Sequence, residues 1–192
     1  TVQHLRETAP SVGPIHFTIA PPANTTFAAP SGGGTGFVTQ AAVSPDGRLI
    51  VFVANEANRF QLWLRPLASL DAHPIAGTED GSFPFWSPDG RYVGFFAAGK
   101  LKKVLVTGGP PVVLCDVAGG RGGTWNRDGV ILFAPDAFGG IYRIAETGGT
   151  PVAVTTVSAP TEGDRFPEFL PDGRRFLFLR VTANDSGLYG GT

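Results

Sequence analysis

The tetrapeptide Ser87-Pro88-Asp89-Gly90 is the feature around which this sequence is organised. Near copies of it occur at Ser44-Pro45-Asp46-Gly47, Asn126-Arg127-Asp128-Gly129 and Leu170-Pro171-Asp172-Gly173. The aspartates of consecutive copies are 43, 39 and 44 residues apart, which matches the length of one β-propeller blade, about 40–45 residues. Proline presets φ, aspartate tolerates the next position, and glycine adopts a left-handed conformation, so each copy predicts a tight hairpin turn.

The segments between the turns predict short strands. A continuously apolar run follows each turn, at residues 49–53, 92–96, 130–133 and 176–179. Such a run is typical of a strand that is covered on both faces, as the central strands of a blade are covered by neighbouring blades. A third strand is expected at 62–64, 101–103, 141–143 and 188–189, and a fourth at 112–115 and 152–155. Four short strands joined by tight turns make one propeller blade.

These patterns predict an all-β propeller with three complete four-stranded blades and a partial fourth. We expect blades at about 37–79, 80–120, 121–160 and 161–192, after a linker over 1–14, a single strand at 16–20 and a long loop over 21–36. Closed propellers have about 4–8 blades, so the chain is expected to be a fragment of a larger propeller. The alternative is a small ring that residues 16–20 close. Open blade edges would favour self-association.

The composition excludes several function classes. The formal net charge is −1 and no long run of Lys or Arg occurs, so nucleic-acid or membrane-surface binding has no electrostatic support. One cysteine, Cys115, allows no internal disulfide. We expect no membrane contact within this chain, because its apolar runs are too short for a transmembrane helix.

No catalytic constellation is recognisable. The chain has no kinase motif, no Gly-x-Ser-x-Gly elbow and no phosphate-binding loop, since residues 31–36 fit neither glycine fingerprint. His4, His16 and His73 share no ligand spacing, and we predict no metal, no cofactor and no enzymatic activity. Cys115 is interpreted as a small buried strand residue. The three tryptophans could stack on a ligand, but their repeated strand positions favour packing between blades, at Trp63, Trp86 and Trp125.

One group of charged residues is a candidate ligand site. The loops that enter the innermost strands carry Glu79, Asp80, Asp116, Arg121, Glu162, Asp164 and Arg165. In a propeller such loops converge at one mouth of the central channel, and a concave mouth with polar groups is a common binding site. The alternative is that these charges only solvate surface loops.

The turns, the apolar strand after each of them, Leu62-Trp63 and the Gly-Gly turns resemble the TolB-like propeller repeat over residues 37–192. The stretches 81–104, 123–125 and 166–173 resemble more narrowly the propellers that follow bacterial serine/threonine kinase domains. That resemblance implies a non-catalytic, sensor-like interaction module on the extracytoplasmic side of a bacterial membrane. Two alternatives remain open: a free periplasmic scaffold resembling TolB, and the propeller of a prolyl-oligopeptidase-like enzyme without its hydrolase domain. The protein or small-molecule ligand is unknown.

Overall fold

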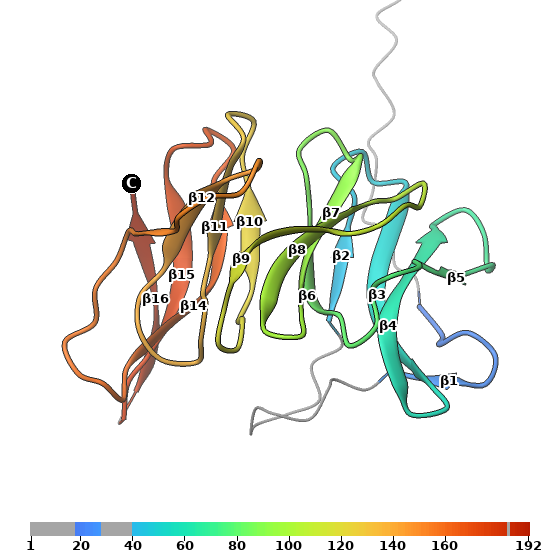
Figure 1. The fold of residues 1–192 in the computed structure, drawn as a ribbon, viewed down its shortest axis with the longest axis horizontal. Coiled ribbons are helices and arrows are strands. Elements are labelled where there is room, and N and C mark those ends of the chain that lie inside the picture. The colour runs from blue at the N-terminus through green and yellow to red at the C-terminus, as the bar shows by residue number, and fades with distance from the viewer. Residues whose placement is uncertain (1–17, 28–39, 184) are drawn as a thin grey trace, which may run out of the picture.

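The structure is a computed structural model that describes residues 18–27, 40–183 and 185–192. The described residues form strands and no helix, and the strands make four antiparallel sheets that stand in a row in chain order (Figure 1). The all-β propeller prediction is therefore confirmed. Within the described residues no helix is long and apolar enough to cross a membrane. The predicted linker over 1–14 and the glycine-rich stretch 31–36 lie outside the described residues.

Each sheet is one blade. Blade 1 consists of β1 (Thr25–Thr26), β2 (Ala41–Val43), β3 (Leu49–Glu56), β4 (Arg59–Pro66) and β5 (His73–Pro74). Blade 2 consists of β6 (Ser82–Trp86), β7 (Tyr92–Ala97), β8 (Lys100–Leu105) and β9 (Val112–Asp116). Blade 3 consists of β10 (Gly123–Trp125), β11 (Val130–Phe133), β12 (Tyr142–Ala145) and β13 (Val152–Ala153). Blade 4 has three strands, β14 (Gly163–Phe169), β15 (Phe176–Val181) and β16 (Ser186–Gly191).

The repeated tetrapeptides form the predicted turns, which join β2 to β3, β6 to β7, β10 to β11 and β14 to β15. Their glycines have φ between +67° and +73°, the left-handed region that glycine adopts without steric cost. The Ser87 hydroxyl donates to Asp89 at 2.6 Å and accepts the Tyr92 amide at 2.9 Å. Leu170 has no such side chain. Asp172 accepts the Arg174 amide at 3.0 Å, as Asp89 accepts the Arg91 amide, and it also accepts the Arg175 amide at 3.0 Å. A carboxylate bound by backbone amides thus replaces the missing hydroxyl.

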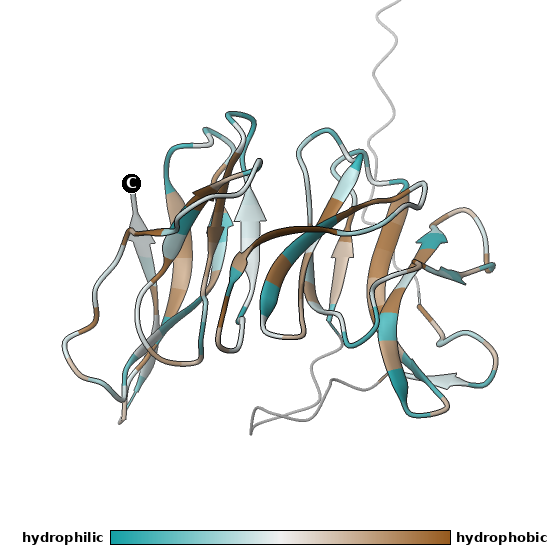
Figure 2. Cartoon of the chain, viewed as in Figure 1, coloured by the Kyte–Doolittle hydropathy of each residue, from teal (hydrophilic) through white to brown (hydrophobic). Residues whose placement is uncertain are grey.

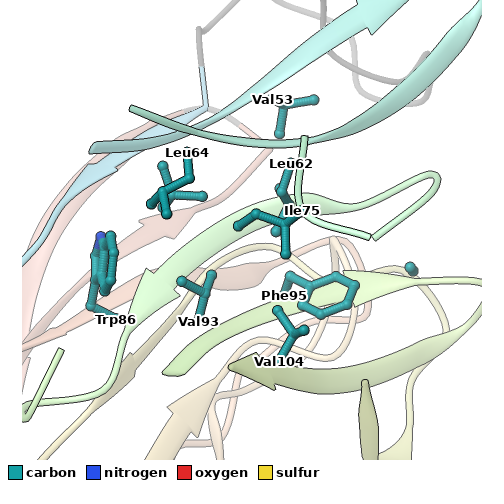
Figure 3. Close-up of a cluster of buried hydrophobic side chains, with 10 residues drawn as sticks. Val53, Leu62, Leu64, Ile75, Trp86, Val93, Phe95 and Val104 are labelled. Atoms are coloured by element: carbon teal, nitrogen blue, oxygen red, sulfur yellow. The ribbon is translucent and has the colours of Figure 1, made fainter. Parts of the chain in front are cut away.

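The apolar core lies between the blades. The strands carry the apolar residues, as along β3 in Figure 2. Between blades 1 and 2, Leu62 and Ile75 face Phe95 in a buried cluster (Figure 3). Similar clusters join blade 2 to blade 3 and blade 3 to blade 4. Trp86 and Trp125 are buried in these clusters, which confirms the packing between blades predicted for them. Trp63 is also buried, but on the outward face of blade 1, in a cluster that contains no residue of another blade.

Three local expectations need correction. Residues 18–20 form no strand, and Ile19 packs on blade 1, so these residues do not complete blade 4. The expected loop over 21–36 contains β1, because Thr25 and Thr26 pair with the end of β3. The predicted strand at 152–155 shortens to β13, because the amides of Val154 and Thr155 both donate to the Ile141 carbonyl and the Ile141 amide donates to the Thr155 hydroxyl, which itself donates to Asp164.

Candidate functional site: the mouth of blades 2 to 4

The innermost strands β2, β6, β10 and β14 lie next to one another across the row, and three of the blades have a residue with left-handed φ four residues before the turn. In β6 the register with β7 shifts between Ser82 and Phe85, and in β14 the register with β15 shifts between Arg165 and Glu168. Phe83 and Phe166 have φ of 49° and 53°, and Gly122 at the same position of blade 3 has φ of 88°. Bulges of this kind redirect side chains and are common beside functional sites.

Blade 1 carries a larger irregularity at the same place. Thr26 lies opposite Asn55 and Ala41 lies opposite Phe52. Thr26 and Ala41 are fifteen residues apart in the chain, whereas their partners Asn55 and Phe52 are only three residues apart. The register therefore changes by twelve residues between β1 and β2. Gln40 resumes the ladder, because its carbonyl accepts the Val53 amide at 2.9 Å.

The irregular positions of the four blades are in contact. The Gln40 side-chain oxygen accepts the Phe83 amide. The Phe83 and Phe166 rings are 5.7 Å apart between centroids, although they belong to blades 2 and 4. This contact is reached over Gly122, where an added Cβ would lie 2.9 Å from the Phe166 ring. Glycine at this position of blade 3 thus lets two phenylalanines meet at the mouth, and Phe166 remains 45% exposed.

Two of the predicted site residues, Arg121 and Arg165, belong to this mouth. Each immediately precedes the irregular position of its blade, and the Phe166 amide donates to the Arg121 carbonyl at 2.9 Å. The Arg121 guanidinium lies over the Phe83 ring at 5.8 Å and donates to the carbonyls of Gly119 and Gly120.

Arg165 is held in a similar way. Its Nε donates to the Ala137 carbonyl at 2.9 Å and its guanidinium lies 5.9 Å from the Phe138 ring centre. Burial lowers the pKa of Arg165 most, the neighbouring Arg121 charge lowers it further, and Asp136 acts in the opposite direction. The two arginines therefore share one partly desolvated site.

The predicted residues Asp164 and Glu162 have structural partners. Asp164 is fully buried and accepts from Arg180 Nε at 2.6 Å, from Arg180 Nη2 at 2.8 Å and from the Thr155 hydroxyl at 2.6 Å. The bond to Asp164 is the main cause of the raised pKa of Arg180. Glu162 accepts the Ser158 amide at 2.9 Å. These contacts tie blade 4 to the last loop of blade 3.

The remaining predicted residues lie apart from the arginine pair. Asp116 ends the outer strand β9 and pairs with Lys100 on β8. Glu79 and Asp80 are exposed on the loop between blades 1 and 2, where Asp80 has φ of 56° and its amide donates to the Phe60 carbonyl. The structure thus brings together two of the seven predicted residues, Arg121 and Arg165.

The aromatic part of the mouth was missed from the sequence. Phe83 and Phe166 read as ordinary apolar strand residues, and Phe138 lies in a loop between β11 and β12. A signal was present, because Phe83-Pro84 and Phe166-Pro167 stand at the same distance before their turns. A repeated Phe-Pro pair ahead of a turn is therefore a marker for the bulge position in this chain.

Two further features lie away from the mouth. A hollow of about 320 Å³ lies between blades 3 and 4 beside the turns, and its lining includes Asn126, Arg143, Phe169 and Arg174. Within the described residues no group of three or more His, Cys, Asp or Glu side chains could hold a metal ion. Burial raises the pKa of the half-buried Cys115 thiol, which disfavours the reactive thiolate.

Comparison with known proteins supports the fold. No protein-family model matches the chain, and no curated protein matches its sequence. Among solved structures, a TolB from Agrobacterium tumefaciens is similar with a TM-score of 0.70 and 19% identity, over 79% of this chain and 60% of that one. TolB from Acinetobacter baumannii is similar with a TM-score of 0.62 and 17% identity, over 78% of this chain and 40% of that one.

Enzymes also occur among the similar structures. An oligogalacturonate lyase in complex with manganese has a TM-score of 0.57 and 15% identity, over 79% of this chain and 49% of that one. The chain thus spans less than two thirds of each of these proteins. At these identities the similarity establishes the TolB-like propeller architecture, and one architecture hosts many functions.

Proposed function

We propose that this chain is a non-catalytic binding module whose ligand site is the mouth of blades 2 to 4. The observation that carries the proposal is the meeting of Phe83, Arg121, Phe166 and Arg165 from three different blades. Ligand sites are commonly concave, largely apolar and marked by a few convergent polar groups. The left-handed φ of two phenylalanines adds support, because a strained backbone costs energy and is retained most often at functional sites.

The experiment is a thermal-shift screen of chemically sorted small molecules and peptides on the wild-type chain and two variants. Phe166→Ala removes an exposed mouth ring, and Arg174→Gln changes an exposed residue beside the far hollow. A binding module of this kind predicts ligands that stabilise the wild type and Arg174→Gln and that lose their effect on Phe166→Ala. Ligands that stabilise the wild type and Phe166→Ala but not Arg174→Gln would place the binding site at the far hollow and contradict the proposal.

We further propose that the module is the extracytoplasmic, sensor-like part of a bacterial serine/threonine protein kinase. The support is the sequence resemblance of residues 81–104 and 166–173 to propellers that follow such kinases. Sequencing the parent gene tests this: a kinase domain and a membrane helix upstream are expected. A parent without a kinase domain would refute the assignment.

A second candidate is a free periplasmic scaffold, which the similarity to two TolB structures favours. Its parent gene would encode a secretory signal peptide directly upstream of the propeller. A nucleophile elbow downstream would instead indicate a peptidase. The same sequencing experiment therefore separates the three parents.

A further inference from the structure

Three equivalent residues meet beside the turn at each boundary between consecutive blades. They are the last residue of the following blade's innermost strand, the first residue of the strand after the preceding blade's turn, and the residue of the next strand that pairs two positions further along. Between blades 1 and 2 these are Trp86, Leu49 and Leu64, between blades 2 and 3 they are Trp125, Tyr92 and Lys103, and between blades 3 and 4 they are Phe169, Val130 and Arg143.

At the first two boundaries large side chains fill this place. Trp86 and Leu64 are buried together in the cluster between blades 1 and 2. Between blades 2 and 3 the Tyr92 and Trp125 rings are 6.2 Å apart between centroids, and Lys103 Nζ lies 4.9 Å from the first centroid and 5.6 Å from the second. The place thus holds either apolar packing or a cation beside two aromatic rings.

At the third boundary the same place is hollow. Val130 stands where blade 2 has Tyr92, and Phe169 stands where blade 3 has Trp125, so one ring is absent and the other is smaller. The hollow of about 320 Å³ between blades 3 and 4 is lined by Val130, Arg143 and Phe169, and Phe169 is only half-buried. An apolar cavity of about 150 Å³ is enough to hold benzene, so the hollow has room for a substituted aromatic ring.

The cation of this place is retained without its rings. Arg143 is exposed, and within the described residues its guanidinium has no acidic partner and lies over no aromatic ring. A guanidinium stacks favourably on an aromatic face. Arg174 also lines the hollow, but it has no counterpart between blades 2 and 3, because the turn of blade 3 is one residue shorter than that of blade 4.

We propose that the hollow between blades 3 and 4 binds an uncharged aromatic ring. The ring takes the place that the Tyr92 ring occupies at the preceding boundary, against Phe169 and beside Arg143. It gains from covering the half-buried Phe169 ring and from the arginine charge. The ring can belong to a small molecule or to an aromatic side chain of a peptide. The site is separate from the mouth, and the inference goes beyond the proposed function.

The test is an amide NMR titration of the full chain with phenol, and with cyclohexanol as the matched non-aromatic control. Phenol should shift the amides of residues 130–132, 143, 153–154, 169 and 173–176. Cyclohexanol should bind about two- to fivefold more weakly, because it offers no aromatic face to the arginine charge.

Three variants assign the site to its residues. Val130→Tyr supplies the ring that blade 2 has at this place, so it should fill the hollow and abolish phenol binding. Arg143→Met should weaken phenol binding about two- to fivefold and leave cyclohexanol binding unchanged, while Arg174→Gln should change neither. The comparison of phenol with cyclohexanol on the wild type keeps the test decisive if Val130→Tyr does not fold.

The other outcomes are equally clear. Equal binding of phenol and cyclohexanol would overturn the aromatic assignment. Phenol binding that Arg174→Gln weakens and Arg143→Met leaves unchanged would overturn the role of Arg143. Phenol that shifts only amides at the mouth, or none at all, would overturn the site. A Gly-Tyr-Gly peptide with blocked ends distinguishes the two sources of the ring: binding of either probe in the hollow supports the site, and the tighter one identifies the source.

Discussion

The outward faces of the first and last blades differ, although both are built from the same kind of apolar strand. On blade 1, Ile50, Phe52 and Ala54 of β3 are at most 3% exposed, and Ile19 and Phe27 pack against this face. On blade 4, Leu177, Leu179 and Val181 of β15 are only half-buried, and Leu188 of β16 is 71% exposed.

The difference comes from neighbours and not from the strand sequences. Val51 and Val53 stand at the same distances from their turn as Leu177 and Leu179, and they are buried because blade 2 covers them. Within the described residues no such cover lies on the corresponding face of blade 4. An apolar run after each turn therefore predicts a strand that is covered on both faces, and the structure shows which of these faces are covered.

The largest expected effect is at the covered face of blade 1. Phe52→Ala should lower the free energy of unfolding by about 3–5 kcal/mol, because a fully buried ring leaves a cavity. Leu179→Ala on blade 4 should cost less than about 1 kcal/mol, since its side chain already meets water. Urea unfolding measures both values. Equal losses would show that the two faces are equally covered in solution.

The second effect concerns the inner side of blade 4, which is held by charge as well as by packing. Asp164→Ala should destabilise the fold by about 3 kcal/mol, because it leaves Arg180 without its buried partner. The double variant Asp164→Ala with Arg180→Met should recover part of that loss. A loss below about 1 kcal/mol in the single variant, typical of exposed ion pairs, would show that the pair is exposed in solution.

The third comparison uses two tryptophans. Trp86 Nε1 donates to the Ala42 carbonyl at 2.9 Å, whereas the buried Trp63 Nε1 has no hydrogen-bond partner among the described residues. Trp86→Phe should therefore cost about 1 kcal/mol more than Trp63→Phe, because it leaves a carbonyl unpaired. Thermal unfolding of the two variants gives the difference. A larger loss for Trp63→Phe would reveal a partner for that indole on the blade 1 face.

The smallest effect is expected in the fourth turn. Two backbone amides and the Arg175 side chain lower the pKa of Asp172 from 3.8 to about 2. Because the folded state prefers the carboxylate, this contribution is present above pH 4 and is lost as the pH falls towards 2. Asp172→Asn should flatten the fall of the urea midpoint in this range, and Arg175→Gln should flatten it less. If the urea midpoint of Asp172→Asn falls with pH as steeply as that of the wild type, the Asp172 carboxylate does not contribute to acid unfolding.

The repeat, its turns and the central strands could be predicted from the sequence because they depend on local chemistry. Ser87-Pro88-Asp89-Gly90 needs no distant partner to turn, and runs such as Leu49–Val53 indicate their own burial. The bulges could not be predicted in this way, since Phe83 and Phe166 reach left-handed φ through contacts with other blades. Asp164 was assigned to the mouth because its partner Arg180 lies on the next strand, and the sequence does not show that these two residues pair.

The same reasoning applies to the residues of the candidate site. Arg121 and Arg165 were placed at one mouth because blade geometry alone brings equivalent loops together. Their rings and carbonyl partners, such as Phe83 and Ala137, depend on the bulges and on the loop between β11 and β12. Long-range partners of this kind leave little trace in a single sequence.

The central claim is that, in the part of the chain that the structure describes, the outward face of blade 1 is covered and the outward face of blade 4 is not. Light scattering over a concentration series tests it directly, on the wild type and on Leu179→Lys, with Arg174→Gln as a control outside this face. An exposed apolar face favours association, so the wild type and the control should rise above 20.1 kDa with concentration while Leu179→Lys stays monomeric. A wild type that stays at 20.1 kDa at every concentration would contradict the claim and show that the face of blade 4 is closed in solution.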